Sequence, residues 1–336
     1  MWVLDSYAPF RISFAGGGTD VSPYVEKNGG VVVNSTIDRG VITRYSPDGL
    51  PLEVSSRDLL ESHTFGMKVS DQSGVMERLL TLMQGHGVTD GKLSISSDVP
   101  PGSGLGSSSA LTISILQILD AIRNVEEKGN EDTAARALGI ERDFFHIALG
   151  KQDPYAIANA GFKKVEFLPG GEVRYTFLKN DSFRNELEKR CLLVYTGMTR
   201  ESSKLLRRQM ELSERGEGKV IDSLNAIRKT AESIFRSAEN GDIDDFCDLI
   251  NQGWKLKRNL GEGVTNERVE SIISTAMNNG AQAARLLGGG SQGFILLVSR
   301  ESGINELQRK MMEASKFVIR TSFQDAGRAV HRKGSS

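Results

Sequence analysis

The sequence predicts an α+β fold in two lobes. Its first third is dominated by β-branched and alternating segments, whereas most of the remainder has helical periodicity and many charged residues. A chain of 336 residues is also long enough for about two domains. We expect an N-terminal lobe over residues 1–180 and a C-terminal lobe over residues 181–336.

The first lobe is expected to begin with strands. The stretch APFRISFAGG (8–17) alternates and ends in glycines, the β-branched run 31–45 ends at the turn SPDGLP, and residues 50–56 are expected to form the return strand. KLSISSDVPP (92–101) alternates and stops at two prolines. A glycine-rich loop and an apolar helix from about Ser108 to Arg123 follow.

Helices and strands are expected to alternate over the rest of the chain. NEDTAARALGIERDFFHIAL (130–149) has helical periodicity, and FKKVEFLPGGEVRYTFL (162–178) predicts a β-hairpin over PGG. Further helical patterns cover 199–260, 265–279 and 304–315, and short apolar runs predict strands at 190–197, 294–299 and 317–323.

Composition disfavours several classes of partner. A formal net charge of −1, from 42 Lys and Arg against 43 Asp and Glu, gives no basic excess for nucleic acid or an anionic membrane. Cys191 and Cys247 stand in unrelated contexts without a CxxC pair, which argues against a structural zinc site. No signal-peptide pattern opens the sequence and no apolar run reaches the length of a membrane span, so we expect a cytoplasmic protein.

The stretch DVPPGSGLGSSSA (98–110) carries the strongest chemical signal. Glycines before a helix let backbone N–H groups face a ligand, and the helix N-terminus adds partial positive charge, so phosphate is the expected ligand. The loop lacks the lysine of GxxxxGK[ST], is one residue short of GxGxxG, and has no VAIK, HRD or DFG partner elsewhere. The alternative is a mobile Gly/Ser linker, which the apolar helix directly after it disfavours.

Three segments together resemble a known family. PPGSGLGSSSA (100–110) is similar to the second motif of the GHMP kinases, which include galactokinase, homoserine kinase, mevalonate kinase and phosphomevalonate kinase. APFRISFAGGGTD (8–20) resembles the first motif and ARLLGGGSQGFILL (284–297) the third, in the family's order. The resemblance implies a ribosomal-S5-like β-α lobe, a ferredoxin-like α/β lobe, and transfer of the ATP γ-phosphoryl group to a small-molecule hydroxyl.

The resemblance implies that the first lobe binds ATP and Mg²⁺. The phosphates would lie against Pro101, Gly102, Ser103, Gly104, Leu105, Gly106, Ser107, Ser108 and Ser109. The hydroxyl of Ser108 or Ser109 and the carboxylate of Glu141 would hold Mg²⁺, which prefers hard oxygen ligands. As part of a charged helical stretch, Glu141 would otherwise be a solvated surface residue.

The segment GKQDPYA (150–156) is similar to the family's catalytic segment. The resemblance assigns Asp153 as the carboxylate that accepts the proton of the substrate hydroxyl or orients it for in-line attack. Lys151 would stabilise developing charge. Without the resemblance, Asp153 before a proline would be a turn former and Lys151 a surface residue.

The first and third motifs are expected to complete the site. In the family the first motif lines the acceptor pocket, which implicates Arg11, Gly16, Gly17, Gly18, Thr19 and Asp20. Asp20 would bond substrate hydroxyls, or would instead form an Asx turn after the glycines. The third motif would hold a glycine loop against the nucleotide side through Gly288, Gly289, Gly290 and Gly293.

The acceptor is the least determined part of the prediction. AGGGTDVSPY, GKQDPYA and YTGMTR resemble a branch that contains heptose 7-phosphate kinases and archaeal mevalonate 3-phosphate 5-kinases. The family's heptose enzymes tend to read GAGGGGF where Ser291 and Gln292 interrupt the loop here, so our first choice is a phosphomevalonate in isoprenoid biosynthesis, with D-glycero-D-manno-heptose 7-phosphate as the alternative. Both are anionic, and Arg11, Lys151, Arg200 and Lys204 are candidate phosphate ligands.

Two other functions of the same fold stay open. One is a non-catalytic ligand sensor, which the presence of Asp153 disfavours, and the other is an ATP-dependent decarboxylase. The expected partner is a small phosphorylated molecule rather than nucleic acid or a membrane, and the family is compatible with a homodimer.

Overall fold

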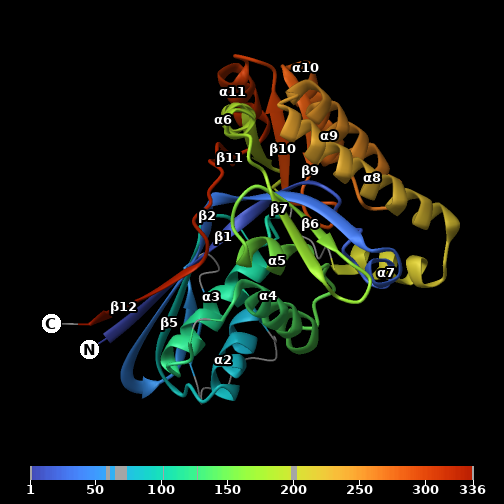
Figure 1. Cartoon of the computed structure of the whole chain (residues 1–336). Helices are drawn as coiled ribbons and strands as arrows, with labels where there is room; N and C mark the ends of the chain where they lie inside the picture. Colours follow the sequence, from blue (N-terminus) through green and yellow to red (C-terminus); the bar gives the residue numbers. More distant parts are fainter. Residues whose placement is uncertain are drawn as a thin grey trace.

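The protein, described here by a computed structural model, contains two β-sheets with helices packed around them (Figure 1). The structure describes residues 2–57, 61–64, 74–100, 102–126, 128–197 and 203–334, without the side chains of residues 61, 203 and 204. Both termini of this described chain lie together at one end of the larger sheet (Figure 1).

The larger sheet has the strand order β12-β1-β2-β5-β3-β4, and β6 and β7 branch from β2. All its pairs are antiparallel except that of β3 with β5. The strands are β1 (Trp2–Ala15), β2 (Gly30–Pro51), β3 (Glu53–Ser56), β4 (Glu61–Thr64), β5 (Asp90–Ser97), β6 (Lys163–Phe167), β7 (Val173–Phe177) and β12 (Ala329–Gly334).

Helices from the first half of the chain cover one face of this sheet (Figure 1). The apolar helix α3 is buried over most of its surface because it packs between β1, β2 and the other helices. These elements are α2 (Val75–Gly85), α3 (Ser107–Ile122), α4 (Asn130–Gly139), the π-helical turn η1 (Ile140–Phe144) and α5 (Gln152–Ala158), whereas the short helix α1 (Tyr24–Asn28) lies beside α7 (Ser203–Glu214).

The smaller sheet is antiparallel, with the order β11-β8-β10-β9. Its strands are β8 (Cys191–Tyr195), β9 (Ala281–Leu286), β10 (Phe294–Ser299) and β11 (Val318–Ile319). The helices around it are α6 (Asp181–Arg190), α9 (Ile243–Arg258), α10 (Glu267–Asn278) and α11 (Ile304–Ala314). Helix α8 (Gly218–Asn240) packs on α9 and on β1, β2 and β6 of the larger sheet, and α7 lies beside α1 and α8.

One hydrophobic core continues through both groups of elements. Phe14 of β1 stacks on Phe162 at 4.8 Å between ring centroids, and Phe246 of α9 meets Phe14 edge-on at 5.5 Å. The division at residue 180 falls directly before α6 and remains a prediction, with β12 as the part of the second segment that joins the first sheet.

Three predicted elements differ from the structure. Residues 53–56 do not return along β2, because β5 occupies that edge and β3 pairs with β5 in parallel. The helical stretch 130–149 ends at Phe144, so residues 145–150 are free to approach the site. Only residues 318–319 of the last predicted strand, 317–323, form a strand, β11, and the last strand of the described chain is β12.

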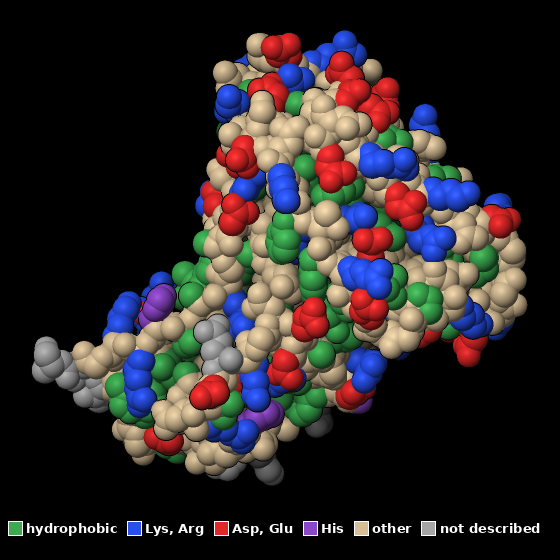
Figure 2. Space-filling view, in the orientation of Figure 1, with side chains coloured by type: hydrophobic (Ala, Val, Ile, Leu, Met, Phe, Trp, Pro, Cys, Tyr) green, Lys and Arg blue, Asp and Glu red, His purple; other side chains and the backbone are tan. Residues whose placement is uncertain are grey.

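The face shown in Figure 2 carries Lys and Arg side chains interspersed with Asp and Glu, without a large patch of one sign. Within the described ranges, no helix combines the length and the apolar character needed to cross a membrane.

Candidate active site

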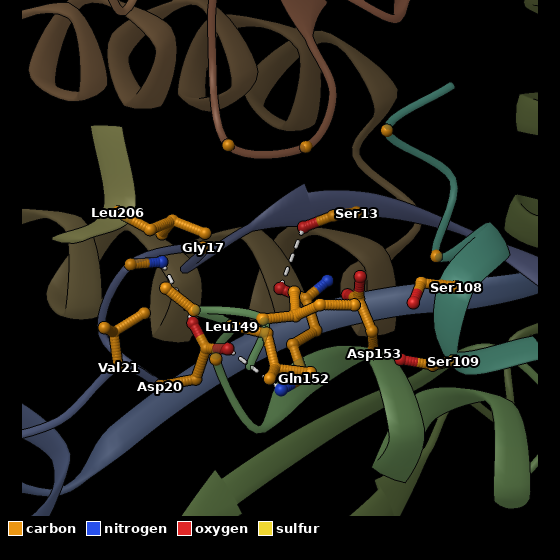
Figure 3. Close-up of a pocket in the computed structure, with 18 of the residues that line it drawn as sticks. Ser13, Gly17, Asp20, Val21, Ser108, Ser109, Leu149, Gln152, Asp153 and Leu206 are labelled. Atoms are coloured by element: carbon orange, nitrogen blue, oxygen red, sulfur yellow. Dashed lines mark hydrogen bonds between the residues drawn. The ribbon is translucent and has the colours of Figure 1, made fainter. Parts of the chain in front are cut away.

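The predicted motifs meet at one cavity of about 230 Å³. Its walls come from β1, the loop before α3, the start of α5, helices α7 and α9, and the loop before β10. Figure 3 shows Ser108 and Ser109 at one end, Gly17 and Asp20 at the other, and Gln152 and Asp153 between them.

The glycine loop has the backbone geometry that the sequence suggested. Gly102, Gly104 and Gly106 have φ angles of 71°, 73° and 78°, in the left-handed region that favours glycine. Gly106 directly precedes α3, so the first N–H groups of that helix and the hydroxyls of Ser107, Ser108 and Ser109 border the cavity. Ser103 and Leu105 are instead buried in the wall.

The third motif forms the back of this loop. The N–H of Phe294 donates to the Ser103 carbonyl at 2.8 Å, and a Cβ on Gly104 would stand 2.7 Å from the Leu287 carbonyl oxygen. Gly288 and Gly289 reach the cavity, whereas Gly293 packs on Ser103 and Gly290 on Val264. Glycine is therefore required where the two loops touch, because a side chain there would collide with the backbone of the other loop.

Asp153 lies in the first turn of α5 and faces the cavity. The Arg11 side chain donates to Asp153 Oδ1 through Nη2 at 2.5 Å and through Nε at 2.9 Å, and to the Gly104 carbonyl at 2.7 Å. Arg11 was predicted to bind the acceptor, but its guanidinium links the carboxylate to the glycine loop.

Glu141 is a buried carboxyl that faces the serines at the start of α3. The Ser109 hydroxyl donates to Glu141 Oε2 at 2.6 Å. Burial raises the pKa of Glu141 to about 7, against the opposing effect of the Ser108 and Ser109 hydroxyls. Glu141 is therefore not the solvated surface residue that was the alternative prediction from the sequence.

Asp20 is fixed by backbone donors. The N–H of Gly18 donates to Oδ1 at 3.0 Å and the N–H of Gln152 to Oδ2 at 2.9 Å, so the Asx turn is present together with a bond to α5. Burial raises the pKa of Asp20 above its usual value, and these bonds oppose the shift. Thr19 bonds the Gly16 and Val31 carbonyls and is a scaffold residue.

Sequence reasoning missed Lys257, which α9 brings to the cavity. Its Nζ donates to the Gly288 carbonyl, and burial lowers its pKa to about 7, with Arg285 and Arg11 adding to the shift. In the sequence WKLKR it is indistinguishable from the solvated lysines of an amphipathic helix. Gln152 and Gln209 were also missed and line the same cavity.

Lys151 is not brought to the site, and other predicted residues fall outside the described ranges. Lys151 points toward α1, where its Nζ lies 3.6 Å from Glu26 Oε1. The structure therefore gives no support to a catalytic role for Lys151. Pro101 and Arg200, and the side chain of Lys204, lie outside the described residues.

A second pocket of about 250 Å³ adjoins the first. It shares Gly102, Ser107 and Ser108 with the main cavity but is largely apolar elsewhere. Its apolar lining comes from Val41, Val75, Met76, Leu79, Ile95, Leu111, Phe145 and Ile147.

Among the described residues, no three His, Cys, Asp or Glu side chains are grouped to hold a metal ion. A divalent cation at Glu141 would thus need further ligands from a bound molecule, as Mg²⁺ commonly takes from nucleotide phosphates.

Comparison with protein families identifies the class. Residues 73–161 match the GHMP kinases N terminal domain and residues 234–316 match the GHMP kinases C terminal domain, together about half of the chain. The chain belongs to the GHMP kinases and is an ATP-dependent kinase. The predicted family and two-lobed α+β fold are confirmed.

Individual relatives include a D-glycero-alpha-D-manno-heptose 7-phosphate kinase of Campylobacter jejuni, 28% identical over 97% of this chain and 98% of its own. A crystal structure of a D-glycero-D-manno-heptose 1-phosphate kinase from Bacteriodes thetaiotaomicron superposes with a TM-score of 0.77, 25% identity, and coverage of 99% of this chain and 100% of that one. A mevalonate kinase of Methanothermobacter thermautotrophicus is 24% identical over 63% of this chain and 65% of its own.

Proposed function

We propose that the protein transfers the γ-phosphoryl group of ATP to the anomeric hydroxyl of a phosphorylated heptose, D-glycero-D-manno-heptose 7-phosphate or a close relative. The observation that carries this proposal is the similarity to a heptose 7-phosphate kinase over almost the full length of both chains. The similarity to a solved heptose phosphate kinase over whole chains supports it.

This assignment replaces the first choice made from the sequence. A phosphomevalonate acceptor has support only from mevalonate kinases, and the match given above leaves more than a third of each chain uncovered. The heptose phosphate, kept as the alternative because Ser291 and Gln292 depart from GAGGGGF, is now the better supported acceptor. Neither residue is among those that line the cavity: the Ser291 backbone carbonyl accepts from the Asn266 side chain, and the Gln292 side chain packs on Gly102.

The proposed chemistry uses Asp153 and Arg11. The acceptor oxygen bonds to the γ-phosphorus, the bond to the β–γ bridging oxygen breaks, ADP leaves, and the hydroxyl proton passes to the Asp153 carboxylate. Arg11 holds that carboxylate on one side and the glycine loop on the other, which fixes the base relative to the phosphates. Positioning of this kind supplies most of the catalysis in phosphoryl transfer.

Ser108, Ser109 and Glu141 fit a magnesium ion. Glu141 is a buried carboxyl with no cationic partner among the described residues, and a serine hydroxyl already lies within hydrogen-bond distance of it. Mg²⁺ held there would neutralise part of the charge on the nucleotide phosphates. The adjoining apolar pocket suits the nucleoside, because it opens at the glycine loop and offers aliphatic and aromatic surface to a base.

The deciding experiment incubates the full chain with MgATP and a panel of heptose 7-phosphates, other phosphorylated sugars and phosphorylated mevalonates, and measures ADP and product mass. We expect ADP with a heptose bisphosphate. Turnover of mevalonate 3-phosphate alone would overturn the acceptor assignment. ADP with loss of carbon dioxide would indicate a decarboxylase, and no turnover with any acceptor would indicate a sensor.

A further inference from the structure

The acceptor end of the cavity contains a cation without a described carboxylate partner. Among the described residues that line the cavity, two are cationic, Arg11 and Lys257. Arg11 is already paired with Asp153. The Lys257 side chain is buried, and its Nζ is bonded to the Gly288 carbonyl alone.

Asp20, a carboxylate that also lines the cavity and attracts the charge of Lys257 electrostatically, is held by other groups. Both of its carboxylate oxygens accept backbone N–H groups, and it forms no ion pair with Lys257. Burying an ammonium group without an anion is costly, because the charge loses its water without a compensating partner. The lowered pKa of Lys257 is the expected consequence of that burial.

Further polar groups converge on the same point. An atom placed on Gly17 as a Cβ would stand 3.9 Å from Lys257 Nζ, 3.7 Å from Gln152 Oε1 and 3.9 Å from Ser13 Oγ. The Gln152 amide nitrogen is buried and has no hydrogen-bond partner among the described residues. Gly17 thus borders a part of the cavity lined by the Lys257 ammonium group and by the Ser13 hydroxyl, which donates to Gln152 Oε1 at 3.3 Å.

This space lies on the acceptor side of Asp153. Figure 3 shows Ser13, Gly17 and Gln152 on the side of Asp153 away from Ser108 and Ser109, where the nucleotide phosphates are expected. We propose that Lys257 binds the phosphate group that the acceptor already carries, and so selects phosphorylated over unphosphorylated sugars. This inference rests on the proposed function, since it names the group by which that site recognises its acceptor.

The kinetic test compares Lys257→Met with Lys255→Met, the exposed lysine two residues earlier on α9. Losing a charge-assisted contact should raise the acceptor KM by roughly 10- to 100-fold, leave the KM for ATP nearly unchanged, and reduce the preference for a phosphorylated over an unphosphorylated sugar. Lys257→Arg should restore part of the affinity, and Lys255→Met should match the wild type. An unchanged acceptor KM, or a loss confined to the KM for ATP, would overturn the inference.

A second pair of variants does not depend on removing the lysine. Gly17→Asp places a carboxylate beside Lys257, with ordinary van der Waals spacing for its Cβ, whereas Gly17→Asn adds a similar volume without the charge. The inference requires the aspartate to weaken acceptor binding at least about tenfold more than the asparagine, as expected for a charge-assisted contact. Equal effects of the two would show that the site does not recognise charge.

Binding of inorganic phosphate separates this inference from the choice of acceptor. The full chain is saturated with Mg²⁺ and a non-hydrolysable ATP analogue, and phosphate binding is measured by calorimetry. If the wild type binds phosphate and Lys257→Met does not, the inference is supported. This holds even if no heptose phosphate is turned over, in which case only the proposed function fails. Equal phosphate binding, or none by the wild type, contradicts the inference.

Discussion

The stability of the ligand-free protein should depend on pH through Glu141. The ordinary pKa of this carboxyl is 4.5, and burial raises it to about 7 in the folded chain. Ionisation therefore opposes folding: the stability present at low pH is lost as pH rises from about 4.5 through about 7, and the loss is complete above that window.

The magnitude follows from the shift. At 1.36 kcal/mol per pKa unit, a difference of about 2.5 units lowers the free energy of unfolding by roughly 3 kcal/mol at pH 8. At pH 5, where the carboxyl is only partly ionised in the unfolded chain, the loss is about 1 kcal/mol. Glu141→Gln keeps the shape and removes the charge. The free energy of unfolding of Glu141→Gln, measured relative to that of the wild type, should thus be about 2 kcal/mol higher at pH 8 than at pH 5.

The assay is urea denaturation without nucleotide or metal at both pH values, with the wild type, Glu141→Gln and Glu131→Gln. Glu131 is exposed on α4 and serves as the matched control, with no pH-dependent difference expected. If Glu141→Gln differs from the wild type by the same amount at pH 5 and pH 8, the carboxyl is not titrating in this window and the reasoning is refuted. The variant should also lose Mg²⁺-dependent ATP binding.

Three further outcomes are expected. Asp153→Asn should lower kcat by at least about 100-fold while ATP still binds, whereas Asp143→Asn on the exposed turn should be unaffected; normal turnover of the Asp153 variant would refute its role as base. Gly104→Ala should lower the free energy of unfolding by roughly 2 kcal/mol or more, because φ is 73° and the new Cβ would meet a backbone carbonyl at 2.7 Å; Gly129→Ala, with open space around it, is the control in the same melting experiment. Leu111→Arg should raise the KM for ATP and not for the acceptor, and the reverse pattern would exclude the apolar pocket as the nucleoside site.

The motifs were predictable because local sequence sets their backbone. The alternating glycines of DVPPGSGLGSSSA permit left-handed φ angles directly before an apolar helix, and Gly102, Gly104 and Gly106 adopt them. Asp153 was assigned because GKQDPYA resembles a family motif. The residues around it come from other parts of the chain and are set by the fold.

The residues that sequence reasoning missed depend on contacts far apart in the chain. Arg11 reaches Asp153 across 142 positions, so nothing local distinguishes a substrate ligand from a residue that orients the base. Lys257 sits between solvated charges of α9, and only tertiary packing buries it. The strand β12, AVHRKG, lacks an alternating apolar pattern because most of its side chains are exposed.

The pairing of β12 with β1 has a consequence for synthesis. The β1 strand is made before the other described strands, yet its outer neighbour β12 follows nearly all the described chain. Until then β1 presents a free sheet edge, which is the feature that invites pairing with other chains. Nascent fragments that stop before Ala329 should consequently be more prone to self-association than chains that include β12.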